Sequence, residues 1–301
     1  MVVHKLRRAG GADAVTATAA VVAAVATGLA GCSQGADAGA APPAGAVVGV
    51  TAGGADGAAA GGAKAGDAGG PLDAVRAVPE LLARAGTSKA RTALEMATGG
   101  TRLTIEGEGG YDFRAGRGRV RVLLPEDGDR PRRRITELFT PGALYMKNRG
   151  AGVPADKWVR VDTAGLADGN LVTGGATDPG AAAELLRAAR HVTYVGAVRV
   201  GGERVAHYRG TTDIGAAAKV ASPRVRKALE AAAKGFATHT VPFDAYLDGE
   251  GRLRKVRHRF SFANGAREVE VTSTTELYGF GAAVDVRLPP HRDIYTGRIA
   301  G

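Results

Sequence analysis

The thiol of Cys32 has the most distinctive chemistry in this sequence, because Cys32 is the single cysteine among 301 residues. It closes the run Leu29–Cys32, directly after an apolar segment. A lone cysteine cannot form a disulfide within the chain, so the folded part must rely on its core alone. Its position instead indicates a site where a lipid can be attached to the sulfur.

The residues that precede Cys32 have the three parts of a secretory signal peptide. Positions 5–8 carry one lysine and two arginines, and residues 14–29 are apolar and uncharged. Where an ordinary signal ends in A-x-A, this one resembles the bacterial lipobox. The pattern predicts cleavage between Gly31 and Cys32 and an S-diacylglyceryl group, with acyl chains such as palmitate, on the Cys32 sulfur. The new amino terminus can then carry a further N-acyl chain.

An uncleaved membrane anchor and an ordinary signal peptide are the alternatives. Residues 14–29 would form a helix of about 24 Å, which is shorter than the roughly 30 Å hydrocarbon core. Asp13, at the start of the apolar segment, departs from the signal pattern. One acyl chain binds a membrane only marginally, whereas the two chains of a diacylglyceryl group give stable anchoring. We therefore expect the protein to be lipid-anchored at the extracytoplasmic face of the cell membrane.

Residues 33–70 consist mainly of glycine and alanine, with two prolines at 42–43. Such a composition cannot bury enough apolar surface to offset the entropy lost on ordering. The sequence therefore divides into three parts. These are a lipoprotein signal peptide over 1–31, a disordered tether over 32–71 and one folded domain over 72–301.

The sequence contains no pattern typical of catalysis or of metal binding. The motifs H-E-x-x-H and G-x-S-x-G and the Walker sequence are absent. Two glycine-rich runs, 107–110 and 116–118, do not lie between a strand and a helix, so we interpret them as turns between strands rather than phosphate loops. We predict that the protein is not an enzyme and binds no metal and no cofactor. The histidines are scattered, at His4, His191, His207, His239, His258 and His291.

The chain is basic, with a formal net charge of +10 and clusters of basic residues at 114–121, 130–134 and 252–259. Two interpretations of these clusters stay open. They form a solvated basic surface, or they dock to anionic headgroups or lipoglycan phosphates. Nucleic acid is a poor partner for an exported protein, and the interleaved aromatic residues of nucleic-acid binders are absent.

Apolar spacing predicts an α+β domain with a few helices and about ten antiparallel strands. Asp178 and Pro179 mark a helix start, because aspartate is a good N-cap and proline suits the first helical position. Helices are expected over 72–84, 88–96, 179–190 and 222–235, with a turn or two in 213–220. Strands are expected near 103–108, 117–124, 135–139, 143–147, 157–161, 191–200, 206–212, 238–247, 253–262 and 267–278.

The dipeptide Asn264-Gly265 predicts a β-hairpin with a type I′ turn. A two-residue loop at these positions would place Phe260 opposite Val269 and Arg259 opposite Glu270. The second pair would join opposite charges across the two strands.

Short runs between residues 95 and 290 resemble a family of actinobacterial lipoproteins that includes LppX and LprG. The runs are 141–147 (PGALYMK), 157–162 (KWVRVD), 207–213 (HYRGTTD), 241–248 (VPFDAYLD) and the tail 278–290. The resemblance implies a LolA-like fold, a strongly curved antiparallel half-barrel with helices on its concave face, closed by the tail as a final strand. It also implies that the domain encloses a lipid or lipoglycan, as some members of the family do.

Two functions from different classes stay open. The domain binds or carries a lipid, lipoglycan or other apolar ligand in a cavity, or it is an envelope sensor or protein-interaction module with a packed core. A continuous apolar cavity of several hundred Å³ would favour the first and a filled interior the second. The sequence does not identify ligand-binding residues. Phe139, Tyr145 and Trp158 fall in adjacent strands and are expected to pack in the core.

Overall fold

The computed structural model describes residues 69–98, 101–126, 132–147, 152–264 and 267–297. The predicted signal peptide, Cys32 and the predicted tether up to residue 68 lie outside the described residues. Within the described part, no helix is both long enough and apolar enough to cross a membrane.

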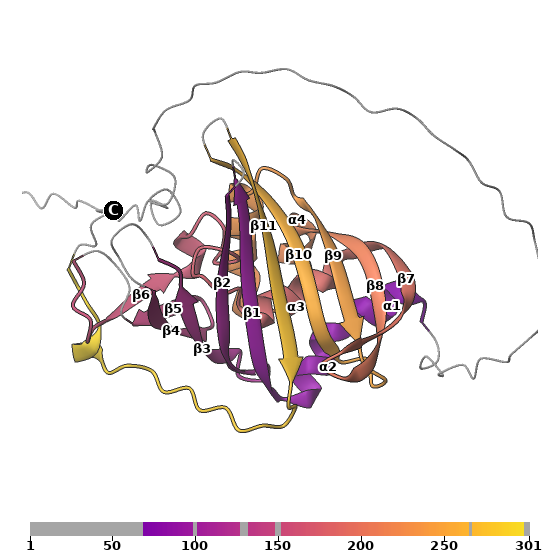
Figure 1. The fold of residues 1–301 in the computed structure, drawn as a ribbon, viewed down its shortest axis with the longest axis horizontal. Coiled ribbons are helices and arrows are strands. Elements are labelled where there is room, and N and C mark those ends of the chain that lie inside the picture. The colour runs from indigo at the N-terminus through magenta and orange to yellow at the C-terminus, as the bar shows by residue number, and fades with distance from the viewer. Residues whose placement is uncertain (1–68, 99–100, 127–131, 148–151, 265–266, 298–301) are drawn as a thin grey trace, which may run out of the picture.

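The described residues build an open antiparallel sheet of eleven strands in the order β6-β5-β4-β3-β2-β1-β11-β10-β9-β8-β7. The chain enters in the middle of the sheet and runs outward to β6. It then crosses to β7 at the opposite edge and returns until β11 lies beside β1 (Figure 1). The strands are β1 (Thr87–Thr98), β2 (Thr101–Asp112), β3 (Arg117–Leu124), β4 (Arg133–Thr140), β5 (Ala143–Lys147), β6 (Trp158–Asp162), β7 (Ala189–Val200), β8 (Glu203–Asp213), β9 (Thr240–Leu247), β10 (Leu253–Asn264) and β11 (Arg267–Tyr278).

The sheet curves as an open half-barrel around helices that cover one of its faces (Figure 1). We call the two sides of the sheet the helix-covered face and the helix-free face. The predicted α+β half-barrel is confirmed. The helical segments are α1 (Pro71–Arg76), α2 (Val78–Ala85), η2 (Thr163–Gly165), α3 (Pro179–Leu185), η3 (Leu186–Ala188), α4 (Ile214–Val220), α5 (Pro223–Gly235) and η4 (His291–Asp293).

Alternation along the strands separates the two faces of the sheet. On β3, Val120 and Val122 are fully buried on the helix-covered face, whereas Arg117, Arg119 and Arg121 are exposed on the other. The buried side chains of the other strands continue this apolar layer toward the helices. The helix-covered face is therefore the core of the domain.

The connection from β6 to β7, residues 163–188, crosses the helix-covered face because the two strands lie at opposite edges of the sheet. Side chains satisfy much of its buried backbone. The carboxylate of Asp168 accepts bonds from three backbone amides, those of Asn170, Val172 and Thr173, at 2.7–3.0 Å. The Thr212 hydroxyl of β8 donates to the carbonyl of Leu185 at 2.5 Å. The crossing segment is thus held to the sheet and forms part of the helix layer.

Two of the predicted helices differ from the structure. Residues 88–96 form most of strand β1 rather than a helix, because Ala90 and Leu94 are buried in alternation with the exposed residues Lys89 and Arg91. This spacing of 90 and 94 fits both a strand and a helix. The helix expected over 179–190 ends at 185, followed by the single turn η3 and by β7. Helices α1, α2, α4 and α5 lie where the sequence predicts them.

The hairpin between β10 and β11 is present, but its predicted register is wrong by two residues. Phe260 pairs with Val271 and Arg259 with Thr272, so the connection consists of residues 265–266, which lie outside the described residues. A shift of two residues leaves every side chain on its predicted face. Alternation therefore could not distinguish the two registers.

The tail that follows β11 runs past the ends of β1 to β3 to the edge of the sheet that β6 forms (Figure 1). The Phe280 ring lies 4.7 Å from the guanidinium of Arg252. Residues 282–290 form no strand, so the closing strand implied by the resemblance is absent from this described segment. Contact with the β6 edge comes further on, where the backbone amide of Tyr295 donates to the carbonyl of Trp158 at 2.8 Å.

A substitution at Gly109 tests whether β2 and β3 approach each other as closely as the structure shows. A Cβ atom at this position would lie 1.9 Å from the carbonyl oxygen of Arg119. We expect Gly109→Ala to lower the free energy of unfolding by about 3 kcal/mol or more, since the backbone of β3 must move. Gly249, where an added Cβ meets no atom within 4 Å, supplies the control. Chemical denaturation of both alanine variants measures the difference, and equal stabilities would contradict the strand pairing.

Candidate ligand-binding site

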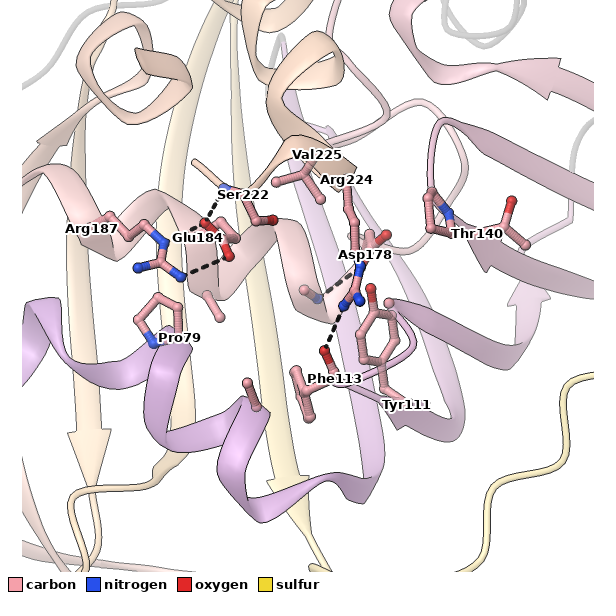
Figure 2. Close-up of a pocket in the computed structure, with 15 residues that line it drawn as sticks. Pro79, Tyr111, Phe113, Thr140, Asp178, Glu184, Arg187, Ser222, Arg224 and Val225 are labelled. Carbon is pink, nitrogen blue, oxygen red and sulfur yellow. Dashed lines mark hydrogen bonds and ion pairs between the residues drawn. The ribbon is translucent and has the colours of Figure 1, made fainter. Parts of the chain in front are cut away.

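A pocket of about 140 Å³ opens at the rim of the helix layer, between α2, α3, the start of α5 and the ends of β2 and β4 (Figure 2). Its apolar wall includes Phe113, whose ring centroid lies 4.9 Å from that of Tyr111. The pocket also has charged groups at both ends. Its lining residues are Pro79, Ala83, Tyr111, Phe113, Gly116, Thr140, Pro141, Asp178, Gly180, Ala183, Glu184, Arg187, Ser222, Arg224 and Val225.

Asp178 occupies one end of the pocket, where it caps helix α3. Its carboxylate accepts a hydrogen bond from the backbone amide of Gly180 at 2.7 Å and another from the Tyr111 hydroxyl. Burial raises the pKa of Asp178 to about 6, although these hydrogen bonds act in the opposite direction. Burial, followed by the nearby Asp178 carboxylate, raises the pKa of Tyr111 well above its usual value. A neutral tyrosine therefore donates to a carboxyl group that titrates close to physiological pH.

Gly180 is required beside this pair. A Cβ atom at position 180 would lie 2.4 Å from the Tyr111 oxygen, so a larger residue would displace the hydroxyl. Figure 2 shows Arg224 beside Asp178 and Tyr111, with its guanidinium turned toward the carbonyl of Phe113. This end of the pocket is thus polar and tightly packed.

Glu184 and Arg187 form the other end of the pocket (Figure 2). Arg187 donates to the Glu184 carboxylate through Nε at 2.5 Å and Nη2 at 3.1 Å, and it pairs with Glu80 of α2 through Nη1. Burial lowers the pKa of Arg187, but the bonds to both carboxylates outweigh it and raise the pKa above its usual value. Glu184 also accepts from the backbone amide of Ser222 at 3.1 Å. We call this set, Glu80, Glu184, Arg187 and Ser222, the clasp, because it fastens α2, α3 and the start of α5 together.

A row of polar side chains lies deeper, on the helix-covered face of the sheet. Thr92 of β1 is directly opposite Thr275 of β11, and His258 of β10 is directly opposite Ser273. Ser88, also on β1, is directly opposite Tyr111 and so connects the row to the pocket. All of the row is buried, with His258 and Ser88 at 0 % exposure. We call Ser88, Thr92, His258, Ser273 and Thr275 the polar row.

Most of the polar row lacks hydrogen-bond partners among the described residues. The hydroxyls of Ser88, Thr92 and Thr275 and both ring nitrogens of His258 have none, whereas Ser273 is 2.6 Å from the Thr177 hydroxyl. Each such group costs about 1–3 kcal/mol when buried without a partner. Burial lowers the pKa of His258 to about 3, so its ring is neutral at physiological pH. The interior therefore contains polar groups that could hydrogen-bond to a ligand.

The site joins residues that are far apart in the sequence. Among them, only Asp178 is marked by a sequence pattern. The start of a helix at Asp178 is predictable, but its place beside Tyr111 depends on the crossing segment. Threonine and serine on a strand give no signal of their own, because the same residues are common on solvated faces. Sequence reasoning therefore missed both the pocket and the polar row.

The aromatic residues considered in the sequence divide between the two faces. Phe139 is buried in the core, as predicted. Tyr145 and Trp158 are only half-buried and lie on the helix-free face, so their predicted place in the core is wrong. Period-2 alternation explains the difference, because Tyr145 and Trp158 are opposite Arg160 and Lys147.

The structure also shows where the glycine-rich runs and the histidines lie. Residues 107–110 lie inside β2 rather than in a turn, whereas Gly116 lies in the turn before β3. His207 contacts the Asp244 carboxylate at 2.8 Å on the helix-free face. His191, His239 and His291 are exposed. The described residues contain no group of three or more potential ligands that could hold a metal ion.

The sequence matches no protein-family model and no curated protein. Solved structures are similar in fold. LprF from Mycobacterium bovis is 12% identical and aligns over 73% of this chain and 96% of its own, with a TM-score of 0.40. LppX from Mycobacterium tuberculosis is 10% identical and aligns over 72% of this chain and 98% of its own, with a TM-score of 0.40. A LolA superfamily protein from Nitrosomonas europaea is 12% identical and aligns over 70% of this chain and 95% of its own, with a TM-score of 0.33.

The fold resembles that of LppX- and LolA-type proteins. These likenesses concern the fold alone.

The raised pKa of Asp178 predicts a pH dependence of stability. Since this pKa is about 6 when folded and about 3.8 when unfolded, the folded state binds the proton more tightly. The contribution of Asp178 to stability is therefore complete below pH 4 and is lost as the pH rises through 6, by up to about 3 kcal/mol, whereas neutral His258 contributes with the opposite sign over the same range and is common to both proteins compared. Asp178→Asn keeps the helix cap and should remove this fall. Chemical denaturation at several pH values between 4 and 7 measures it.

Asp162 provides a control for this measurement, because it caps η2 in the same way but is exposed. Asp162→Asn separates the loss of a capping carboxylate from the burial of Asp178. A difference in stability between the wild type and Asp178→Asn that stays constant between pH 4 and 7 would contradict the assigned environment of Asp178.

Proposed function

We propose that this protein is an extracytoplasmic lipoprotein, anchored to the cell membrane through Cys32, that binds a lipid, a lipoglycan or another apolar ligand. The ligand lies between the sheet and the helix layer. The polar row, buried in an otherwise apolar interior, carries this proposal. It distinguishes the interior from an ordinary packed core, in which buried polar groups are hydrogen-bonded.

A ligand with a long apolar body and a few hydroxyl, ester or amide groups suits this interior. Its apolar part would gain about 25 cal/mol for each Å² removed from water. Its polar groups would pair with the hydroxyls of Thr92 and Thr275 and with the ring of His258. Binding would then relieve a cost that the ligand-free protein carries.

Entry of such a ligand requires the helix layer to move. The pocket of about 140 Å³ is smaller than the roughly 300–1,000 Å³ of typical ligand sites. Helix α3 covers the sheet with Ala181, Ala182 and Ala183, which contribute few apolar contacts to hold it in place. The clasp at Arg187 holds α3 to α2 at the rim. Opening the clasp would extend the pocket toward Ser88 and the rest of the polar row.

We propose no catalytic role for the domain. A nucleophile needs a hydrogen-bonded base, and the interior His258 has no hydrogen-bond partner among the described residues. His207 is bound to Asp244 on the opposite face, where Arg209 and Arg259 also pair with that carboxylate. The buried histidines therefore support binding or packing rather than acid–base chemistry.

Isosteric removal of two hydroxyls tests the ligand site. Thr92→Val and Thr275→Val should each raise the free energy of unfolding by about 1–3 kcal/mol, because each removes a buried group without a partner. The double variant should also retain less lipid. Denaturation and mass spectrometry of lipids that co-purify with the full chain measure the two effects.

Thr177→Val is the matched control. The Thr177 hydroxyl already donates to the carbonyl of Leu171 at 2.6 Å and contacts Ser273, so its removal should lower stability. If the valines at 92 and 275 also destabilise the protein, the row has partners and the argument fails. A native protein that carries no lipid and takes up no apolar fluorescent probe would favour the packed-core interaction module instead.

The anchor is tested separately. Cys32→Ala removes the sulfur that would carry the diacylglyceryl group, so we expect the protein to leave the membrane fraction or to keep its signal peptide. Fractionation with mass measurement of the amino terminus detects either result. Normal processing together with unchanged membrane retention would exclude acylation at Cys32.

A further inference from the structure

A strongly basic surface covers strands β3 to β6 on the helix-free face. Six cationic side chains lie at the outward positions of these four strands, and one carboxylate, that of Asp162, accompanies them. We call the six cations the basic patch; they are Arg117, Arg119, Arg121, Arg134, Lys147 and Arg160. Like charges this close repel one another, so the patch favours an anionic partner.

The basic patch differs from the rest of the same face in how its charges are paired. On the other strands, Lys255 pairs with Glu276 at 2.8 Å, and Arg209 and Arg259 pair with Asp244 at 2.9 and 2.7 Å. By contrast, Arg117, Arg119 and Arg121 form no ion pair or hydrogen bond through their side chains with any described residue. These three side chains are exposed, so their charges are available to a partner.

Carboxylates at the border of the patch are already engaged. Glu108 of β2 is directly opposite Arg121, but it accepts a hydrogen bond from Tyr278 at 2.7 Å and pairs with Arg91 at 3.5 Å. Asp112 is directly opposite Arg117 and accepts two backbone amides in the following turn. Both carboxylates are therefore bound to groups other than Arg117 and Arg121, and the charges of these two arginines stay uncompensated.

Aromatic rings lie among these cations. The register aligns Arg119, Leu138, Tyr145 and Arg160 in one row across the strands. The Arg160 guanidinium lies 6.0 Å from the Tyr145 ring centroid. In the next row, the Lys147 ammonium lies 5.8 Å from the Trp158 ring centroid. Tryptophan and tyrosine combine an apolar ring with a polar tip, a combination suited to the interface between water and lipid.

We infer that the basic patch, with Tyr145 and Trp158, binds the surface of an anionic phospholipid bilayer. The arginines contact lipid phosphates, for which their planar donors are well suited, and the rings lie at headgroup depth. This interaction goes beyond the proposed function, because it requires neither acyl chains on Cys32 nor a ligand in the interior. It places the helix-free face of β3 to β6 toward the membrane.

Vesicle binding tests the inference. The full chain with Cys32→Ala is compared with the same chain carrying Arg117→Gln, Arg119→Gln and Arg121→Gln. The probes are vesicles of phosphatidylglycerol with phosphatidylcholine and vesicles of phosphatidylcholine alone. Each basic residue near an anionic surface is worth about fivefold in affinity, so the triple variant should bind the anionic vesicles about 100-fold more weakly.

The control removes an equal number of positive charges, three, from the opposite side of the molecule. Lys219, Lys227 and Lys234 are exposed on helices α4 and α5. Their replacement by glutamine should lower affinity only a few-fold. The apolar segment 14–29 is the same in all variants, so its contribution cancels. Added salt should weaken the wild-type interaction, because screening shortens the range of the charges.

Trp158 reports directly on the orientation, because it is the single tryptophan of the chain. Phosphatidylglycerol with brominated acyl chains should quench its fluorescence in the wild type and the lysine control, and not in the arginine variant. Equal losses in the two triple variants, or binding without quenching, would overturn the inference. A change in Trp158 fluorescence with soluble polyphosphate but not with vesicles would also overturn it. The basic patch would then bind an anionic polymer rather than a bilayer.

Discussion

The path between β6 and β7 is the constraint on which the rest of the structure depends. These strands are consecutive in the chain but lie at opposite edges of the sheet, so the connecting segment must cross one face. Buried backbone must find hydrogen-bond partners, and Asp168, Thr177 and Asp178 supply them within the segment. The position of α3 follows from this bonding. The pocket lies where α3 meets the end of β2, because Asp178 and Tyr111 join there.

The helix-covered face combines two opposing energetic demands. Apolar side chains from all eleven strands belong to the core that holds the helices in place, whereas the polar row weakens the same layer by leaving hydrogen bonds unmade. Small alanine side chains on α3 limit the area that its removal would expose. The ion pairs of the clasp around Arg187 lie at the rim of the layer. The charged contacts between helices therefore lie at the edge of the site, and the unpaired polar groups lie deeper, on the sheet.

The fold was largely predictable because alternation and helix caps are local signals. Asp178, Pro179 and Pro223 mark helix starts, and the arginines of β3 identify its solvated face. Strand β1 was missed because Ala90 and Leu94 have a spacing that fits both a strand and a helix. The hairpin register could not be distinguished by alternation, since a shift of two residues keeps every face. The site itself depends on the crossing segment, and no local pattern specifies which strands it will cover.

The two faces of β3 and β4 connect the pocket to the basic patch. Val120 and Ile135 pack into the core, and Arg119 and Arg121 lie on the opposite side of the same strands. The pocket includes Gly116 and Thr140, at the ends of these two strands. A bilayer bound to the patch would therefore lie close to the strand ends that line the pocket. An apolar ligand could pass from the bilayer to the interior over a short path, with less exposure of its apolar surface to water.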